Sequence, residues 1–301
     1  MGEEHEGASP VSEFPSPISD SVLLRLAQAA LAEDRAHDDV TTAALLPADQ
    51  AGRAVIIAKA EGVLAGLEIA RAVFAAVDEG LVWAGDLDDG ARLSPGDRVA
   101  SIEGPLSSIL RGERVALNYL THLSGVATAA AAVVKALEGT GCRLRDTRKT
   151  LPGLRGLEKA AVLAGGGENH RMTLADGVLI KDNHLAALRA RGLGIADAVR
   201  LAKESNPGTR IEIEVTTVEE AREAMEAGAD ELLLDNMPAE AMREVVALAA
   251  TAEPRPALEA SGGITLANAR EVAETGVDYI SMGAITHSAA ALDMSLEVEA
   301  G

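Results

Sequence analysis

Up to about residue 140, apolar positions fall in short alternating runs or at helical spacing, but strands and helices do not alternate regularly. The pattern predicts helices over Asp20–Ala32, Leu67–Val77 and Ser107–Leu137, the last with a break near Ser124-Gly125. It predicts strands over Arg53–Ala60, Val63–Ala65, Leu81–Trp83 and Arg98–Ile102. Elements grouped in this way are typical of a separate α+β domain.

From Cys142 onward, apolar runs of strand length alternate with helical segments. The predicted strands are Cys142–Asp146, Gly177–Ile180, Ile211–Val215, Leu232–Asp235, Ala257–Ala260 and Tyr279–Met282. Helices are predicted over Val218–Ala227, Ala239–Ala250 and Leu266–Glu274. Because the connecting loops are short, the strands are expected to be parallel, in a βα barrel or an open sheet.

The predicted fold is therefore α/β. A βα barrel, complete or incomplete, spans residues 141–286. An N-terminal α+β open-sandwich domain precedes it over residues 20–140 and shares the C-terminal tail 287–301. Residues 1–19 are acidic and rich in proline, so we predict a disordered arm there.

Polar residues stand where the predicted strands of the second domain end. They are Arg148, Lys149, Lys181, Glu214, Asp235, Ser261–Gly263 and Gly283-Ala284. In a βα barrel the carboxyl ends of the strands share one face, and the active site forms on that face. Residues spread over most of the domain would thus converge, which favours an enzyme whatever its family.

The charge pattern predicts that this site binds anions. The chain has a formal net charge of -20, yet residues 143–181 contain eight basic side chains and four acidic ones. A locally positive segment in an acidic chain indicates a focused anion site. Arginine binds carboxylates and phosphates through two parallel bonds, and lysine adds a compact charge, so a ligand with several negative groups is expected.

Two glycine-containing loops and two carboxylates add to this site. Ser261–Gly263 and Gly283-Ala284 follow consecutive late strands, where backbone N–H groups can bind a phosphate; tight turns alone are the alternative. Glu212 and Glu214 share one strand face, and only one of them need be catalytic. Glu214 and Asp235 could hold Mg²⁺ or stabilise positive charge on a sugar, or Glu214 could pair with a lysine.

Composition excludes several classes of protein. With 301 residues the chain can form one large or two modest domains, and its five aromatic residues and pI near 4.7 argue against a nucleic-acid partner. The single Cys142 excludes an internal disulfide and fits a reducing compartment. We found no secretion signal and no fully apolar run of about 18 residues, so a cytoplasmic protein without a membrane partner is expected.

The segment from Asp146 to His184 resembles the quinolinate phosphoribosyltransferases, the carboxylating nicotinate-nucleotide pyrophosphorylases. The matching motifs are Asp146–Thr150, Gly165–Gly167, Asn169–Arg171 and Leu179–His184. The resemblance extends from about Ala30 to Ser295. Thr173 and Asp38 depart from it, since the family often has glycine at both places. The stretch Asp38–Thr42 is predicted to be a capped loop packed on the sheet, in preference to a catalytic role.

The resemblance implies a reaction. The family transfers ribose 5-phosphate from phosphoribosyl pyrophosphate to quinolinate, giving nicotinate mononucleotide, pyrophosphate and carbon dioxide in NAD biosynthesis. It implies that quinolinate and the donor are bound by Arg114, Thr147, Arg148, Lys149, His170, Arg171, Lys181, Glu214, Asp235, Ser261, Gly262, Gly263, Gly283 and Ala284.

The resemblance also implies individual roles. Lys149, Glu214 and Asp235 would be catalytic, with Lys149 a candidate proton donor after decarboxylation, and Glu214 and Asp235 would hold Mg²⁺ on the donor. Arg114 would enter the site of a neighbouring subunit, which implies a homodimer with shared sites, or a larger assembly built from it. Two alternatives stay open: a phosphoribosyltransferase for another carboxylated base, and a non-catalytic phosphate-binding barrel.

Overall fold

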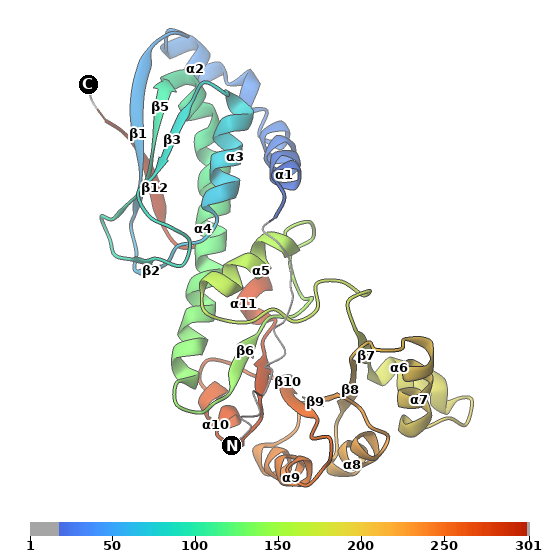
Figure 1. Ribbon diagram of the computed structural model, residues 1–301. Helices are drawn as coiled ribbons and strands as arrows, with labels where there is room; N and C mark the ends of the chain where they lie inside the picture. Colours follow the sequence, from blue (N-terminus) through green and yellow to red (C-terminus); the bar gives the residue numbers. More distant parts are fainter. Residues whose placement is uncertain (1–17, 300–301) are drawn as a thin grey trace, which may run out of the picture.

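The computed structural model describes residues 18–299, so most of the predicted acidic arm lies outside the described residues. The described chain forms two domains joined by one long helix, α4 (Leu106–Leu137) (Figure 1). The first domain carries an antiparallel sheet and the second a parallel one.

The N-terminal sheet has the strand order β12-β1-β5-β3. Its strands are β1 (Ala51–Ala58), β3 (Val82–Gly85), β5 (Arg98–Pro105) and β12 (Met294–Glu299). β12 comes from the far end of the chain and pairs antiparallel with β1, from Arg53 opposite Glu299 to Ala58 opposite Met294. A separate ribbon pairs β2 (Gly62–Val63) with β4 (Arg92–Leu93), a strand that the apolar pattern did not predict because it is only two residues long.

Helices α1 (Asp20–Glu33), α3 (Leu67–Val77) and α4 pack together beside this sheet (Figure 1). The predicted apolar stripe on α3 comprised Leu67, Ala70, Val73, Phe74 and Val77. Its three central residues are buried, as is Ile69, which the stripe omitted, whereas Leu67 and Val77 at the helix ends are half-buried. The stretch Asp38–Thr42, predicted to be a loop, is instead mostly helical. Asp38 ends η1 (Ala36–Asp38), and Val40–Thr42 begin α2 (Val40–Leu45). Asp39 caps α2 by accepting the N–H groups of Thr41 and Thr42, each at 3.0 Å.

α4 runs unbroken through Ser124 and Gly125, so the predicted break is wrong. Gly125 is needed for close approach instead, because a Cβ there would overlap the carbonyl oxygen of Ala290. The Ser124 hydroxyl donates to the Ala65 carbonyl at 3.2 Å and accepts the Ala65 N–H at 3.0 Å.

By length and composition alone α4 could cross a membrane, but 56% of its most apolar 18-residue window is buried in the protein, as in a core helix.

The second domain contains six parallel strands in the order β6-β11-β10-β9-β8-β7. They are β6 (Arg143–Arg145), β7 (Val178–Ile180), β8 (Ile211–Val215), β9 (Glu231–Asp235), β10 (Ala257–Ser261) and β11 (Tyr279–Ser281). β6 and β7 are the two edges, and on the free side of β6 an isolated bridge joins Arg145 to Glu168. Because the sheet does not close between β6 and β7, the barrel is incomplete.

Helices connect the strands as alternation predicted. They are α5 (Arg155–Ala164), α6 (Asp182–Arg189), α7 (Ile195–Ser205), α8 (Val218–Glu226), α9 (Ala239–Ala249), α10 (Ala269–Ala273) and α11 (Ala284–His287). The pattern gave no ranges for α5, α6, α7 and α11, and it overestimated α10, whose predicted first turn is held in another conformation by Asn268. The Asn268 side-chain oxygen accepts the N–H of Thr265 at 2.7 Å.

Buried charges inside the sheet show how strongly it curves. Arg145 on β6 bonds Glu231 on β9 and Glu259 on β10, at 2.5 and 2.9 Å. β6 and β9 are three strands apart, which is about 14 Å in a flat sheet, so only a curved sheet brings these groups together. Burial raises the pKa of both glutamates, although Arg145 opposes the rise. The fold prediction, an α/β barrel domain with an N-terminal α+β domain, is confirmed.

Candidate active site

The structure places the predicted barrel residues at the carboxyl ends of neighbouring strands. Lys181 directly follows β7, Glu214 lies near the end of β8, and Asp235 is the last residue of β9. Thr147–Lys149 lie just after β6. Ser261 ends β10 and is followed by Gly262 and Gly263, and Gly283-Ala284 lie just after β11. Strand geometry alone thus carries these side chains to one end of the curved sheet.

The loops after β6 and β11 are held against each other. The Thr147 hydroxyl accepts the N–H of Lys149 at 2.9 Å, and Thr286 donates its hydroxyl to the Lys149 carbonyl at 2.8 Å. The Lys149 side chain lies over Gly283, where a Cβ would come within 2.8 Å of the Lys149 Cδ. Glycine at this position therefore makes room for the lysine.

Arg148 and Arg171 form a neighbouring pair of like charges. Neither has an ion-pair partner within residues 18–299, and the Arg148 Nε is buried without a hydrogen-bond partner. Arg171 donates to the Gly177 carbonyl at 2.9 Å. Burial and the nearby charge of Arg148 lower the pKa of Arg171. An anion between these guanidinium groups would satisfy both.

His170 turns its ring into the barrel interior. Its Nε2 lies 2.9 Å from a Glu212 carboxylate oxygen, and its Nδ1 accepts the N–H of Arg171 at 2.8 Å. Burial lowers the pKa of His170, but Glu212 and Glu259 outweigh it and the net change is upward. In this arrangement both ring nitrogens have protein partners.

Among the described residues, His170, Glu212 and Glu259 are the one group of three side chains close enough to hold a metal ion. The hydrogen bonds oppose such a site. Because Nδ1 accepts a hydrogen bond, Nε2 carries the ring proton and donates it to Glu212, so no lone pair is left for a metal.

Glu214 lies beside Lys181, with 3.2 Å between the carboxylate and the ammonium. The predicted alternative of a lysine salt bridge is therefore present in this structure. Asp235 on the adjacent strand accepts the side-chain amide of Asn236 at 2.8 Å. Mg²⁺ on a phosphorylated substrate usually takes one or two carboxylates and fills its other positions with phosphate and water, so these two residues fit such an ion.

The loop after β10 needs its glycines. Gly262 and Gly263 have φ angles of 85° and 64°, which side chains rarely adopt. A Cβ on Gly262 would also come within 2.5 Å of the Asn236 side chain. The Asn236 N–H bonds the Ser261 carbonyl at 2.9 Å, so the loops after β9 and β10 form one unit.

Arg114 is apart from the other predicted residues. Its side chain is 64% exposed on α4, and its ion-pair partner is Glu113 at 3.7 Å. Within the described chain, no ion pair or hydrogen bond joins it to the residues at the strand ends.

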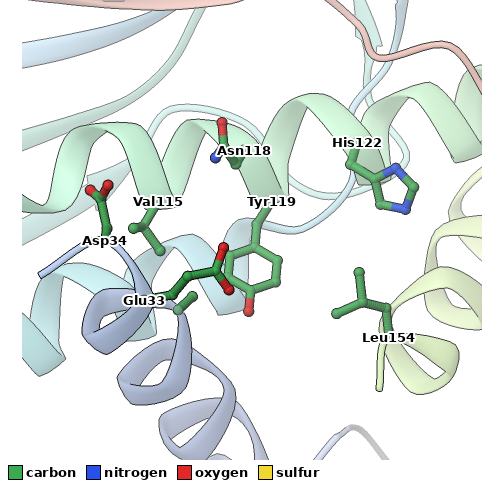
Figure 2. A pocket seen from close by; sticks show the side chains of 8 residues that line it. Glu33, Asp34, Val115, Asn118, Tyr119, His122 and Leu154 are labelled. Atoms are coloured by element: carbon green, nitrogen blue, oxygen red, sulfur yellow. The ribbon is translucent and has the colours of Figure 1, made fainter. Parts of the chain in front are cut away.

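Two cavities lie near these elements. The smaller, of about 250 Å³, lies between α1, α4 and the start of α5, and Glu33, Tyr119 and His122 face it (Figure 2). The larger, of about 1090 Å³, is lined by residues at the amino ends of the strands, among them Arg143, Arg210 and Tyr279. Of the predicted site residues, only His170 and Arg171 line it, and Lys181, Glu214 and Asp235 at the carboxyl ends do not.

Sequence reasoning assigned no role to Asp146, Glu158 and Lys159, which are all fully buried behind the loop that carries Arg148. The sequence does contain a pattern that indicates the burial of Glu158 and Lys159. Glu158 and Lys159 occur next to each other beside Leu157, Ala161 and Val162, which form the apolar side of α5. Charges at such positions are expected only where they have partners.

Comparison with known proteins agrees with this geometry. Residues 39–124 match the N-terminal domain and residues 126–297 the C-terminal domain of quinolinate phosphoribosyl transferase. The chain belongs to the quinolinate phosphoribosyltransferase family.

Relatives of this family are similar over nearly their whole length. The probable nicotinate-nucleotide pyrophosphorylase [carboxylating] of Bacillus subtilis is 42% identical over 270 residues, 88% of this chain and 90% of that protein. The human nicotinate-nucleotide pyrophosphorylase [carboxylating] is 42% identical over 259 residues, 85% of each chain. The solved structure of NadC from Streptococcus pyogenes has a TM-score of 0.88 at 37% identity, covering 95% of this chain and 99% of the other.

Proposed function

We propose that this member of the quinolinate phosphoribosyltransferase family transfers the 5-phosphoribosyl group of phosphoribosyl pyrophosphate to quinolinate with decarboxylation. The products are nicotinate mononucleotide, pyrophosphate and carbon dioxide. The observation that carries the proposal is that Arg148 and Arg171, which have no carboxylate partner in the described chain, stand on two segments that Lys159 and Asp146 bond together. The two neighbouring carboxylates of quinolinate match this pair.

At the quinolinate end, Arg148 and Arg171 bind the carboxylates, and Lys181 adds a third positive charge. Charge-assisted bonds of this kind are about twice as strong as neutral ones and fix the ligand's orientation. His170, predicted to face quinolinate, contacts Glu212 in this structure and would have to turn to reach the substrate.

At the donor end, Glu214 and Asp235 would face the ribose and hold Mg²⁺, which would supply positive charge to the departing pyrophosphate. The loops Ser261–Gly263 and Gly283-Ala284 offer backbone N–H groups to the 5-phosphate, and Thr147 belongs to the loop between the two substrates. Lys149, whose side chain lies over Gly283, would act between the phosphate loop and the arginine pair.

The reaction then has two stages. The quinolinate nitrogen forms a bond to the anomeric carbon as the bond to pyrophosphate breaks, and the carboxylates of Glu214 and Asp235 stabilise the positive charge that develops on the sugar. The resulting pyridinium loses the adjacent carboxylate as carbon dioxide, leaving the bonding electrons on the ring carbon. Lys149 donates a proton to that carbon.

The proposed active form is a homodimer, because Arg114 is predicted to bind substrate yet no ion pair or hydrogen bond joins it to the strand-end residues of its own described chain. A partner subunit would bring its Arg114 to the quinolinate end. A larger assembly can be built from the same dimer.

The direct test is an assay with quinolinate, phosphoribosyl pyrophosphate and Mg²⁺ that follows carbon dioxide and pyrophosphate together. Equal amounts of the two products support the proposal. Pyrophosphate released with a different base, and none with quinolinate, would favour the alternative phosphoribosyltransferase. Absence of turnover with any carboxylated base, despite tight phosphate binding, would favour a binding protein.

A further inference from the structure

Helix α5 contains two neighbouring charged residues that are shielded from solvent. Glu158 and Lys159 each have 0% relative exposure. Charged side chains are almost never buried to this extent unless they are paired. Each of them contacts a segment of the proposed active site, and the proposed reaction uses neither.

Lys159 joins two segments that are distant from each other in the chain. Its ammonium forms a buried ion pair with Asp146, the first residue after β6, and donates to the His170 carbonyl at 2.8 Å. The same Asp146 oxygen accepts the N–H of His170 at 2.9 Å. The end of β6 and the segment around His170 are thus locked together by three bonds through one charged pair.

Each locked segment carries one arginine of the unpaired pair. Arg148 stands two residues after Asp146, and Arg171 directly follows His170. Glu158 holds the segment after β6 at a second point, Leu151. Its carboxylate accepts the Leu151 N–H at 3.1 Å and contacts the His122 ring at 2.8 Å.

Stability alone does not explain this arrangement. A buried ion pair is often no more stabilising than apolar residues of the same volume, since both charges must leave water. Burial raises the pKa of Asp146 to about 6 although Lys159 opposes the rise, and burial lowers the pKa of Lys159. What the pair supplies is a set of directional bonds between the two segments.

We propose that Lys159 and Asp146 are positioning residues that set the separation of Arg148 and Arg171 for a ligand with two adjacent carboxylates. This inference rests on the proposed function and names residues of that site that do not touch the substrate. A displacement of about 1 Å in a positioned binding group can cost about 100-fold in rate. The pair therefore governs quinolinate use more than donor use.

The test compares Lys159→Met with the double variant Asp146→Asn/Lys159→Met in steady-state kinetics and thermal unfolding. Lys159→Met leaves an unpaired buried carboxyl group, so both the melting temperature and quinolinate use should fall. We expect KM for quinolinate to rise about tenfold or more, and KM for phosphoribosyl pyrophosphate to change less than about threefold. The double variant removes both charges and should regain melting temperature. Its KM for quinolinate should stay raised, because the bond from Lys159 to the His170 carbonyl is still missing.

Glu231→Gln is the matched control, since it breaks another buried ion pair in the same barrel without contacting the site loops. It should lower the melting temperature and leave KM for quinolinate within about twofold. The proposal is overturned if the double variant regains both melting temperature and wild-type KM, because the pair would then serve stability only. If Lys159→Met does not fold, the double variant decides alone.

Wild-type turnover is measured first, so that failure of the proposed function can be told apart from failure of the positioning role. A wild-type protein that releases no carbon dioxide from quinolinate contradicts the proposed function. An active wild type whose two variants keep its KM for quinolinate contradicts only the positioning role.

Discussion

Arg148 and Arg171 show how a side chain can be held in place by its surroundings and yet lack a counter-charge. Their positions follow from bonds made by neighbouring residues, including Asp146 and Lys159. Burial lowers the pKa of Arg171, and the like charge of Arg148 lowers it further. A bound dicarboxylate would supply the counter-charge that both guanidinium groups lack within the described chain.

Arg171→Ala tests the quinolinate end of the site. Losing one partner of a desolvated charge pair typically costs roughly 2–5 kcal/mol, so kcat/KM for quinolinate should fall by at least about 30-fold. The dependence on Mg²⁺ should change far less, since Arg171 is proposed to touch the other substrate. Steady-state kinetics with each component varied gives the answer. Arg189→Ala, which removes an exposed arginine on α6, is the control, and equal kinetics for the two variants would remove Arg171 from the site.

Asp235→Asn tests the donor end while keeping the shape of the side chain. It removes a negative charge beside the sugar on which positive charge develops, so we expect kcat to fall about 100-fold with the fold intact. Initial rates at saturating Mg²⁺ measure the loss, and circular dichroism checks the fold. A rate close to that of wild type would assign Asp235 to the structure of the loop that it shares with Asn236.

At the scale of helices and strands, α4 shows why a glycine can mislead. Gly125 predicted a break because glycine is a poor helix former, but its neighbour in space is the backbone at Ala290. No local pattern contains that contact, since the two residues are 165 positions apart.

Gly125→Ala should therefore destabilise the protein even though alanine favours helices. Overpacking against a backbone atom costs typically 1–3 kcal/mol, which exceeds the gain of about 1 kcal/mol in helix propensity. Denaturant unfolding measures the balance. Ala132→Gly, at an exposed position of the same helix, measures propensity alone. A stabilised Gly125→Ala variant would show that the C-terminal segment does not press on α4 in solution.

The strands of the barrel domain could be predicted because each is a compact apolar run, and the polar residues at their ends follow from parallel topology. The buried pair Glu158 and Lys159 could not be assigned in this way. A charged residue on a helix is ordinarily solvated, and only the tertiary contacts with Asp146, Leu151 and His170 show why these two are inside. The turn of His170 toward Glu212 likewise depends on the curvature of the sheet, which no single strand encodes.

At the scale of the whole molecule, Arg114 predicts shared active sites. Arg114→Ala and Lys149→Ala should each be nearly inactive alone. In a mixed dimer, one site combines intact Lys149 from one subunit with intact Arg114 from the other, and the second site carries both defects. Random mixing gives about half mixed dimers with one working site of two, so roughly a quarter of wild-type activity should return.

The control for this complementation is proof that subunits exchange, for example by co-purification of two differently tagged chains. If exchange occurs and activity does not return, Arg114 acts in its own subunit or binds no substrate.

The pairing of β12 with β1 has a consequence for folding during synthesis on the ribosome. Residues 51–58 emerge early, but their partner strand, residues 294–299, is made only after the 235 residues between them. Until then β1 presents an open edge on that side, which another nascent chain could join. The barrel, whose strands are complete by residue 281, can form while the domain that precedes it in the sequence still waits for its final strand. The N-terminal sheet can therefore close only once residues 294–299 are available to pair with β1, and not when the first domain has been synthesised.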